Sequence, residues 1–325
     1  MRVITRLEEL QAYLPFGIDE ELRASAKTFT VKITDYLLNL VNTGDQPDPI
    51  LKQFIPDVRE QIKHIDFTLD PFEERRYNPL PGVFHKYHQR VLLTVSAHCA
   101  VHCRFCFRRW MPIVTPDWPK TVAYLQQHPR VKEVVLSGGD PLMLSIHQLR
   151  TIMNYLMEVP QLCSVRIHSR LPVAYPAKSY DFPWSEYPSL RKVLVIHCNH
   201  PSELGMETAR LCQYLTEQKV ALFSQTVLLK GVNDRVKLLS ALYEKLWAIG
   251  VHPYYLHLLD RVQGTAHFET SALRAKRLYA LLQHYLPGYL VPKLVREEHT
   301  GKRYLSNYYD CNHSISCTGD GGCLG

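Results

Sequence analysis

The sequence has no apolar stretch of the kind that crosses a membrane. None of its uncharged runs approaches the roughly 18–20 residues that a membrane span needs. Its amphipathic start, MRVITRLEELQAYL, is unlike a secretory signal peptide. It also lacks internal repeats, low-complexity segments and the basic stripe or module motif of a nucleic-acid-binding protein. We therefore expect a cytoplasmic, globular protein that binds neither membranes nor nucleic acid.

The chain carries enough apolar sequence for a substantial core. Hydrophobic residues make up 46% and charged residues 21% of its 325 residues, which suits one large domain or two small ones. The formal net charge is only +7, and the positive residues are scattered. This pattern predicts an ordinary solvated surface, with a preference for anionic groups or an acidic partner protein as the alternative.

The number and spacing of the cysteines indicate a functional rather than a structural role. The nine cysteines are an odd number, and three of them stand within eight residues. Such clustering favours a metal centre in a reducing compartment over a disulfide framework.

The pattern of elements changes along the chain. Residues 1–85 are predicted to form a mainly helical N-terminal subdomain, residues 86–295 a core with alternating strands and helices, and residues 296–325 a C-terminal tail. One predicted helix carries Leu239, Leu242, Leu246 and Ile249 on one face, with Asn233 or Asp234 as its N-cap and Gly250 at its end. The six strand candidates are Val91–Val95, Val131–Leu136, Val165–Ile167, Val193–Ile196, Val220–Leu229 and Tyr254–Leu259.

Six strands followed by helices predict an α/β fold with parallel strands and helical crossovers. Roughly 200 residues are too few for a closed eightfold barrel, so we expect a partial, six-stranded barrel or a doubly wound sheet. In both architectures ligands bind at the C-terminal ends of the strands, where all the motifs described below are placed.

Cys99, Cys103 and Cys106 follow the first predicted strand in a CxxxCxxC spacing. Three thiolates on one loop can bind a single soft metal centre, and three ligands leave one iron of a four-iron cluster without a protein ligand. A structural zinc site is an alternative, but it requires a fourth ligand, and His98 and His102 do not complete a zinc pattern. The remaining alternative is three unrelated buried thiols.

This cysteine motif resembles that of the radical S-adenosylmethionine superfamily. The resemblance implies a partial (β/α)6 barrel and a [4Fe-4S] cluster on the three cysteines, whose free iron binds S-adenosylmethionine. The run Ser137, Gly138, Gly139, Asp140, Pro141 is similar to the superfamily's glycine-rich loop. Its two glycines permit close approach of the backbone to a ligand, and the carboxylate suits an ammonium group. By itself, however, Gly-Gly-Asp-Pro is also an ordinary turn.

A narrower resemblance, to the lysine 2,3-aminomutase family, extends from about residue 72 to residue 295. It implies that radical chemistry is combined with pyridoxal 5'-phosphate. The motifs that carry it keep the family's order and spacing; they are HKYHQRVLL at 85–93, CFRR at 106–109, HCNHP at 197–201, QTVLLKGVND at 225–234 and PYY at 253–255 leading to Asp260.

Pyridoxal phosphate needs a lysine for its Schiff base. The resemblance assigns this role to Lys293, which ends an apolar run. The catabolic aminomutases have a run of glycines before this lysine, whereas this chain has Tyr289, Leu290, Val291 and Pro292. That departure resembles the branch called elongation factor P β-lysylation protein.

The resemblance also implies roles for other residues. Arg90, Lys86, Tyr87 and Gln225 should hold the phosphate or ring of the cofactor, and His197 should lie beside S-adenosylmethionine. Arg108 should bind the substrate carboxylate, because a guanidinium forms two parallel hydrogen bonds with a carboxylate; an ordinary surface charge is the alternative. Asp260 should bind the distant ammonium of a lysine substrate, and a second aspartate of the family falls where Leu286 stands.

The predicted activity is therefore an isomerase that converts free L-lysine to β-lysine. The resemblance adds an electron donor such as flavodoxin or ferredoxin, a homo-oligomeric state, and a functional link to elongation factor P and its lysine ligase. Rival interpretations are an aminomutase acting on another amino acid such as glutamate, an iron–sulfur or zinc protein without enzymatic activity, and a pyridoxal enzyme without a radical.

Six cysteines lie outside the motif. Cys163, Cys198 and Cys212 stand in or near apolar runs and are predicted to pack as small buried hydrophobes. Cys311, Cys317 and Cys323 lie in a polar, glycine-rich stretch, for which a flexible tail and a zinc site with His313 are the two hypotheses.

Overall fold

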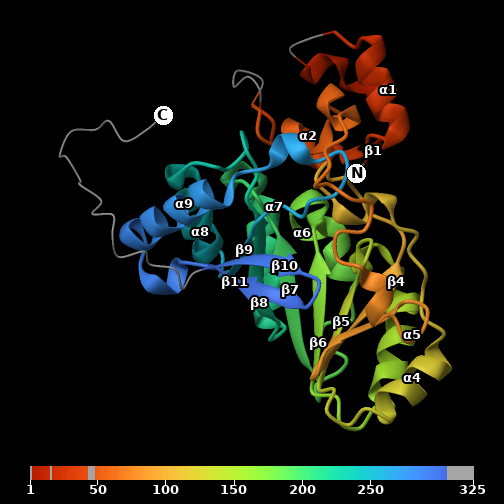
Figure 1. Ribbon diagram of the computed structural model, residues 1–325. Helices are drawn as coiled ribbons and strands as arrows, with labels where there is room; N and C mark the ends of the chain where they lie inside the picture. The colour runs from red at the N-terminus through yellow and green to blue at the C-terminus, as the bar shows by residue number, and fades with distance from the viewer. Residues whose placement is uncertain (1, 15–16, 43–47, 306–325) are drawn as a thin grey trace.

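The computed structural model describes residues 2–14, 17–42 and 48–305, so that Cys311, Cys317 and Cys323 lie outside the described residues. Its centre is a nine-stranded sheet in the order β11-β10-β9-β8-β7-β6-β5-β4-β3 (Figure 1). The strands are β3 (Val83–Tyr87), β4 (Arg90–Ser96), β5 (Glu133–Gly138), β6 (Ser164–Ser169), β7 (Arg191–His197), β8 (Ala221–Val227), β9 (His252–His257), β10 (Lys293–Glu298) and β11 (Gly301–Tyr304).

Neighbouring strands from β4 to β10 run parallel, and β3 and β11 pair antiparallel at the two ends. Helices connect the strands: α4 (Trp118–Gln126), α5 (Ile146–Met157), α6 (Leu171–Ala174), α7 (Met206–Glu217), α8 (Val236–Ala248) and α9 (Ala272–Tyr285). The strand order never reverses, as it does in a doubly wound sheet. The fold is therefore a partial α/β barrel, as the sequence predicts, with β10 as a seventh parallel strand beyond the six predicted.

The six predicted strands are confirmed as β4 to β9, and the predicted helix is α8. Its N-cap, however, is Arg235, which makes no side-chain capping bond, so the prediction of Asn233 or Asp234 is wrong. The Asn233 side chain instead accepts from Leu229 N and donates to two backbone carbonyls, which holds the turn after β8. Gly250 follows the helix with φ +81°, as a C-terminal glycine should.

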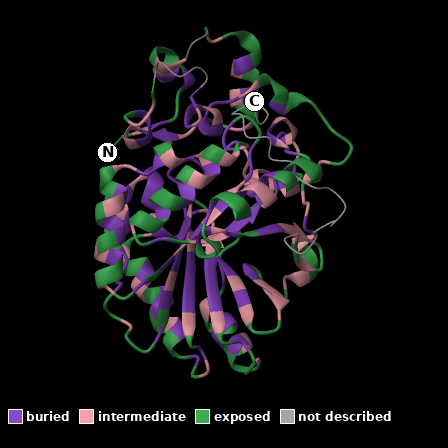
Figure 2. Cartoon of the chain, turned by 90° about the vertical axis from the view of Figure 1, so that its left-hand side faces the viewer, coloured by how far each residue is buried: buried purple, intermediate pink, exposed green. Residues whose placement is uncertain are grey.

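Alternation along the strands gives the sheet two different faces. Leu136, Ile167, Leu194, Leu222 and Leu256 are buried in the main hydrophobic cluster together with residues of the helices. Their neighbours in sequence point the other way, because side chains alternate along a strand. Figure 2 shows the buried strands surrounded by helices that are exposed on their outer sides. The second face therefore lines the interior of the barrel.

The N-terminal segment lies over the C-terminal ends of the strands (Figure 1). It contains a two-stranded antiparallel sheet and three α-helices, and Thr34 Oγ1 donates to Ala174 O at 2.5 Å, just after β6. Its elements are β1 (Val3–Ile4), α1 (Glu20–Thr28), β2 (Ile33–Thr34), α2 (Asp35–Leu38) and α3 (Leu51–Phe54). The division into domains stays a prediction; the boundary drawn after residue 295 falls within β10.

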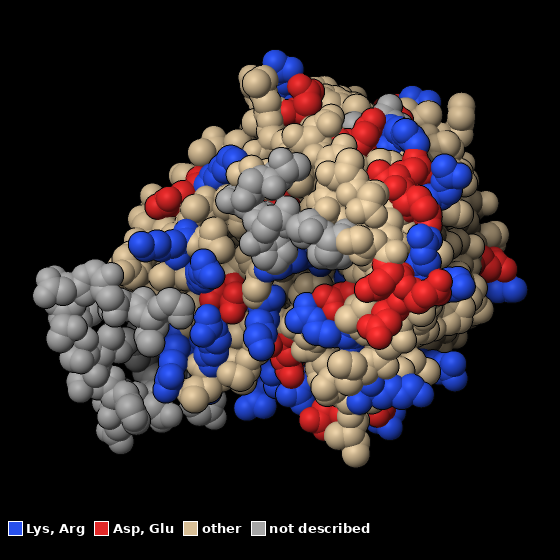
Figure 3. All heavy atoms as spheres, turned by 90° about the horizontal axis from the view of Figure 1, so that it is seen from above, with Lys and Arg blue, Asp and Glu red and all other residues tan. Residues whose placement is uncertain are grey.

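Surface features agree with a mildly basic protein. Seen from above, Lys and Arg side chains are interspersed with Asp and Glu (Figure 3). No helix among the described residues combines the length and the apolarity needed to cross a membrane. Cys198 and Cys212 are buried as predicted, whereas Cys163 is exposed, because it lies in the turn before β6 rather than inside an apolar layer.

Candidate active site

Cys99, Cys103 and Cys106 lie on the loop that follows β4, at the C-terminal rim of the barrel, and all three are free thiols. Burial raises the pKa of Cys103 to about 12 and also raises the pKa of Cys99 and Cys106. The charge of Cys106 adds to the increase for Cys99 and Cys103, and the charge of Cys103 adds to that for Cys99. Among the described residues no three potential ligands surround a single metal position. A metal centre held by these thiols would compensate the cost of burying thiolates.

The glycine-rich loop after β5 packs directly against the cysteine loop. A Cβ on Gly139 would lie 2.6 Å from His98 O, and one on Gly138, with φ +108°, would lie 2.7 Å from Ser96 O. Gly139 N donates to Ser96 O at 2.6 Å. The glycines thus allow the two loops to approach each other closely. The sequence pattern predicts close approach of a ligand instead. Ser137 precedes them on the inner face of β5.

Asp140 is buried, and its carboxylate accepts four internal hydrogen bonds. The donors are Ser169 Oγ at 2.7 Å, Arg170 N at 2.9 Å, Leu171 N at 3.0 Å and Leu142 N at 3.1 Å. Burial nevertheless raises the pKa of this carboxyl group. Asp140 therefore ties β5 to β6 beneath the cysteine loop, and its contact with a ligand ammonium stays a prediction.

Four residues form one row across neighbouring strands. His197 of β7 pairs with Gln225 of β8, Gln225 with Tyr255 of β9, and Tyr255 with Lys293 of β10. Register partners in a parallel sheet present their side chains to the same face. Among the described residues no group hydrogen-bonds or ion-pairs with the Lys293 ammonium, which lies 5.9 Å from the ring centre of Tyr254. Lys293 is thus a free amine on the same face as His197 and Gln225.

The residues predicted to hold the cofactor phosphate make two separate sets of contacts. The Arg90 guanidinium lies 3.8 Å from the ring centre of Tyr87, and both line a cavity of about 380 Å³ at the N-terminal ends of β4 to β7. The prediction that all the motifs lie at the C-terminal ends of the strands is therefore wrong for Arg90, because this residue begins β4. Lys86 Nζ instead donates to Glu297 Oε1 at 3.0 Å, and Tyr87 Oη reaches the same oxygen at 3.2 Å. These two bonds join β3 to β10 and so close the open side of the barrel.

The two residues predicted to bind the substrate both have internal neighbours of opposite charge. Arg108 donates to both oxygens of Glu74, at 2.7 and 2.8 Å, and both side chains are largely buried. Burial raises the pKa of Asp260 to about 7, and the charge of Glu297 adds to this while that of Lys302 opposes it.

The cysteine loop and the barrel interior meet at Asp260. The charge of Asp260 contributes to the raised pKa of Cys106, so these two groups are neighbours. Asp260 comes shortly after β9, the strand that pairs with β10 and therefore with Lys293. Lys293 itself is the first residue of β10, and its sharing one site with the three thiols stays a prediction.

Comparison with known proteins places the chain in a family. No family model matches it. It is, however, 39% identical over 291 residues to the L-lysine 2,3-aminomutase of Haemophilus influenzae, covering 87% of this chain and 86% of that protein. It is 37% identical over 308 residues to the L-lysine 2,3-aminomutase of Escherichia coli, covering 91% and 89%. The chain belongs to the L-lysine 2,3-aminomutase family. It is therefore an isomerase.

Among solved structures, this aminomutase-family chain is similar to a radical SAM methyltransferase from Sphaerobacter thermophilus. The TM-score is 0.45 and the sequence identity 17%, over 67% of this chain and 69% of that chain.

Sequence reasoning missed two further histidines inside the barrel of this aminomutase-family enzyme. His168 Nδ1 lies 3.2 Å from His197 Nε2, and His257 Nε2 is buried with no hydrogen-bond partner among the described residues. Burial and nearby cations, Arg166 for His168 and Lys302 for His257, hold the pKa of both imidazoles well below the usual value. The alternation of side chains along the strands could have identified both histidines, because each stands at an inward position of its strand.

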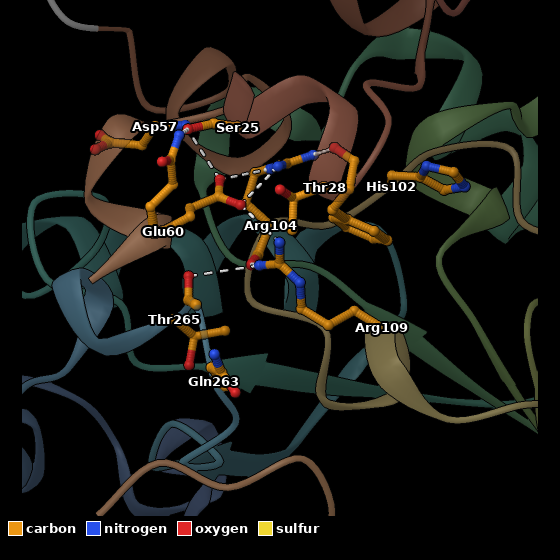
Figure 4. A network of polar contacts seen from close by, with 12 residues as sticks. Ser25, Thr28, Asp57, Glu60, His102, Arg104, Arg109, Gln263 and Thr265 are labelled. Atoms are coloured by element: carbon orange, nitrogen blue, oxygen red, sulfur yellow. Dashed lines mark hydrogen bonds and ion pairs between the residues drawn. The ribbon is translucent and has the colours of Figure 1, made fainter. Parts of the chain in front are cut away.

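A buried ionic network fixes the cysteine loop to the N-terminal segment (Figure 4). Glu60 accepts from Arg104 Nε at 2.7 Å, from Arg104 Nη2 at 2.6 Å and from Arg109 Nη2 at 2.7 Å. Arg104, which stands between Cys103 and Cys106, is completely buried and also donates to Phe29 O at 2.7 Å. Only the tertiary structure shows this network, because its members are far apart in sequence.

Leu286, where the family's second aspartate was expected, is buried in the main hydrophobic cluster after α9. A side chain there packs with the helices rather than facing the interior of the barrel.

Proposed function

We propose that this protein is an L-lysine 2,3-aminomutase that works with a [4Fe-4S] cluster, S-adenosyl-L-methionine and pyridoxal 5'-phosphate. The observation that carries the proposal is the placement of Lys293. Its free amine belongs to the same inward row as His197 and Gln225, in a barrel whose rim carries Cys99, Cys103 and Cys106.

The residues present fit the groups that such an enzyme holds. When bound, the cluster with S-adenosylmethionine supplies hydrogen-atom abstraction, and pyridoxal phosphate supplies a carbonyl group that holds the substrate amine. Lys293 offers the amine for the second group, while Arg90 and Tyr87, which line one cavity, offer a cation and a hydroxyl for its phosphate.

The chain's own contribution is to position the substrate and exclude water. A reactive carbon centre attacks nearby C–H bonds indiscriminately, so the substrate must be fixed and solvent kept out. The N-terminal segment covers the rim of the barrel, and the Glu60 network holds the cysteine loop against it. In this proposal Arg108, which donates to both oxygens of Glu74, exchanges that partner for the substrate carboxylate, and Asp260 holds the ammonium.

A spectrum of the anaerobically reconstituted protein tests the cofactors. The proposal requires a broad cluster band near about 400 nm together with pyridoxal absorbance that borohydride bleaches. Cys103→Ala should remove the cluster band and all turnover but leave the pyridoxal absorbance. A protein that carries only one of the two chromophores after reconstitution would contradict the combined chemistry.

Turnover of L-lysine and of glutamate separates the proposal from its main rival. The predicted position of the distal group is beside the carboxyl group of Asp260, whose pKa is raised to about 7, whereas Glu297 is already paired with Lys86 and Lys302. A second substrate carboxylate would be repelled there, whereas an ammonium would be attracted. Lysine should therefore be converted to β-lysine and glutamate should not react.

We further propose that this enzyme supplies the β-lysine with which the lysine ligase modifies elongation factor P. Flavodoxin or ferredoxin would be the electron donor of the aminomutase. The support is the resemblance of the sequence around Lys293 to the corresponding branch of the family. The test is to incubate this enzyme with labelled lysine, the ligase and the factor, and to measure whether labelled β-lysine becomes attached to the factor. Failure of the label to reach the factor would contradict the link without affecting the proposed reaction.

A further inference from the structure

Two histidines on neighbouring strands face each other inside the barrel. His168 belongs to β6 and His197 ends β7, and the residues just before them, Ile167 and Ile196, belong to the main hydrophobic cluster on the outer face of the sheet. Because side chains alternate along a strand, both imidazoles point inward. His168 Nδ1 lies 3.2 Å from His197 Nε2, and the two ring planes are inclined at 78°. This distance is that of a hydrogen bond between two ring nitrogens.

Both imidazoles are neutral near pH 7. Burial and the charge of Arg170 lower the pKa of His197 to about 3, and burial and the charge of Arg166 hold the pKa of His168 well below its usual value. A neutral imidazole has one N–H donor and one acceptor nitrogen. If His197 donates from Nε2, both rings carry their proton on Nε2; if His168 donates from Nδ1, both carry it on Nδ1. The bond therefore requires the two histidines to have the same tautomer.

The same bond determines what the pair offers to a ligand. Neither His197 Nδ1 nor His168 Nε2 has a hydrogen-bond partner among the described residues, and both side chains keep some exposed surface. Because the tautomers are coupled, one of these two nitrogens is a donor and the other is an acceptor. An imidazole held through one nitrogen presents the other in a defined direction and protonation state, as functional histidines do when a neighbouring residue orients them.

Simple packing of two rings is the main alternative, and a third histidine of the barrel provides a comparison. His257 of β9 also points inward and is buried, yet its Nε2 has no hydrogen-bond partner among the described residues. An inward position on a strand thus does not by itself give a histidine a ring partner. The contact between His168 and His197 is therefore a feature of this pair.

The end of β6 that carries His168 is held by the glycine-rich loop. The two residues that follow His168 both bind the carboxylate of Asp140: Ser169 Oγ donates at 2.7 Å and Arg170 N donates at 2.9 Å. The backbone beside His168 is thereby fixed against the loop after β5. His168 thus projects from an anchored strand end, as a residue that orients another side chain must.

We propose that His168 is a positioning residue that holds the imidazole of His197 in one orientation and one tautomer, so that His197 Nδ1 can form a hydrogen bond with S-adenosylmethionine. The inference rests on the proposed function, since the family resemblance places His197 beside that cofactor. It involves no covalent step. His168 strengthens binding because the ring of His197 does not have to be ordered when the ligand arrives.

NMR spectra that correlate the ring nitrogens and carbon-bound protons of ¹⁵N-labelled histidine measure the tautomers in the full-length protein before reconstitution. His168 and His197 should both show one tautomer, and it should be the same for the two. In His168→Leu, the ring of His197 should become a mixture of tautomers, because its partner is gone. Opposite tautomers in the wild type would contradict the hydrogen bond and with it the proposal.

Calorimetric titration of the cluster-loaded protein with S-adenosylmethionine, without reductant, measures the effect on binding. His168→Asn keeps an amide group on Cγ, where histidine carries Nδ1, so it can still reach His197 Nε2. Glutamine is closer to histidine in size, but its amide lies one bond further from the backbone. His168→Asn should therefore bind within about threefold of the wild type, whereas His168→Gln and His168→Leu should bind roughly tenfold more weakly.

A packing role predicts the opposite order, because glutamine fills the space better than asparagine. If His168→Asn bound S-adenosylmethionine no better than His168→Gln, the proposal would be overturned. Iron content and pyridoxal absorbance show whether each variant is folded and loaded. His252→Asn, the same change at the exposed start of β9, is the matched control and should leave the affinity unchanged. A wild-type protein that did not bind S-adenosylmethionine would instead refute the proposed function, so the two failures are distinguishable.

Discussion

Replacing Glu60 by glutamine should destabilise the protein strongly, although the change is nearly isosteric. The carboxylate accepts three charge-assisted bonds of 2.6–2.7 Å from Arg104 and Arg109, in a fully buried site. An amide keeps one acceptor oxygen, turns an N–H₂ group toward the guanidinium groups and leaves two buried positive charges without a counter-charge. Breaking a buried ion pair from one side costs about 3–5 kcal/mol.

Urea unfolding of the reduced apoprotein measures this cost, and iron content after anaerobic reconstitution measures its effect on the cysteine loop. We expect a lower unfolding midpoint, together with loss of cluster loading, because Arg104 stands between Cys103 and Cys106. The control is Glu186→Gln, since Glu186 pairs with Arg150 at the surface, where an ion pair contributes at most about 1 kcal/mol. If Glu60→Gln shifted the midpoint no more than the control, the network would not anchor the loop.

Three further changes test other parts of the site. Burial and the charge of Glu297 raise the pKa of Asp260 to about 7, so this carboxyl group is largely neutral at lower pH and ionised at higher pH. Because the ionised form binds an ammonium group better, the KM for lysine should fall several-fold between about pH 6 and pH 8. Asp260→Asn should abolish that pH dependence. Lys293→Ala should eliminate borohydride-sensitive absorbance and β-lysine formation, yet retain the cluster and reductive cleavage of S-adenosylmethionine; near-normal isomerisation would contradict the assignment. Gly139→Ala, whose Cβ would meet His98 O at 2.6 Å, should cost about 1–3 kcal/mol and reduce iron loading, whereas Gly288→Ala, with open space around it, should do neither.

Local patterns predict what depends on local physics. Six of the seven inner strands, β4 to β9, were recognisable because β-branched and aliphatic runs alternate with helical spacing. Gly250 marked the end of α8 because a left-handed backbone favours glycine. The CxxxCxxC spacing predicts one metal-binding loop because its three thiols are close along the chain. The N-cap of α8 was missed because Asn233 is engaged by β8 and the turn after it, a tertiary contact that competes with capping.

Contacts between segments that are far apart in the chain could not be predicted from local sequence patterns. The succession of elements predicts a parallel α/β fold, the spacing of the three cysteines predicts their loop, and the family resemblance identifies Lys293 as the candidate amine. The contacts of Glu60 with the cysteine loop, of Glu74 with Arg108 and of Lys302 with Glu297 are visible only in the folded protein. The reason is that an ion pair depends on distance in space and on burial, and a sequence specifies neither until the register and curvature of the whole sheet are fixed.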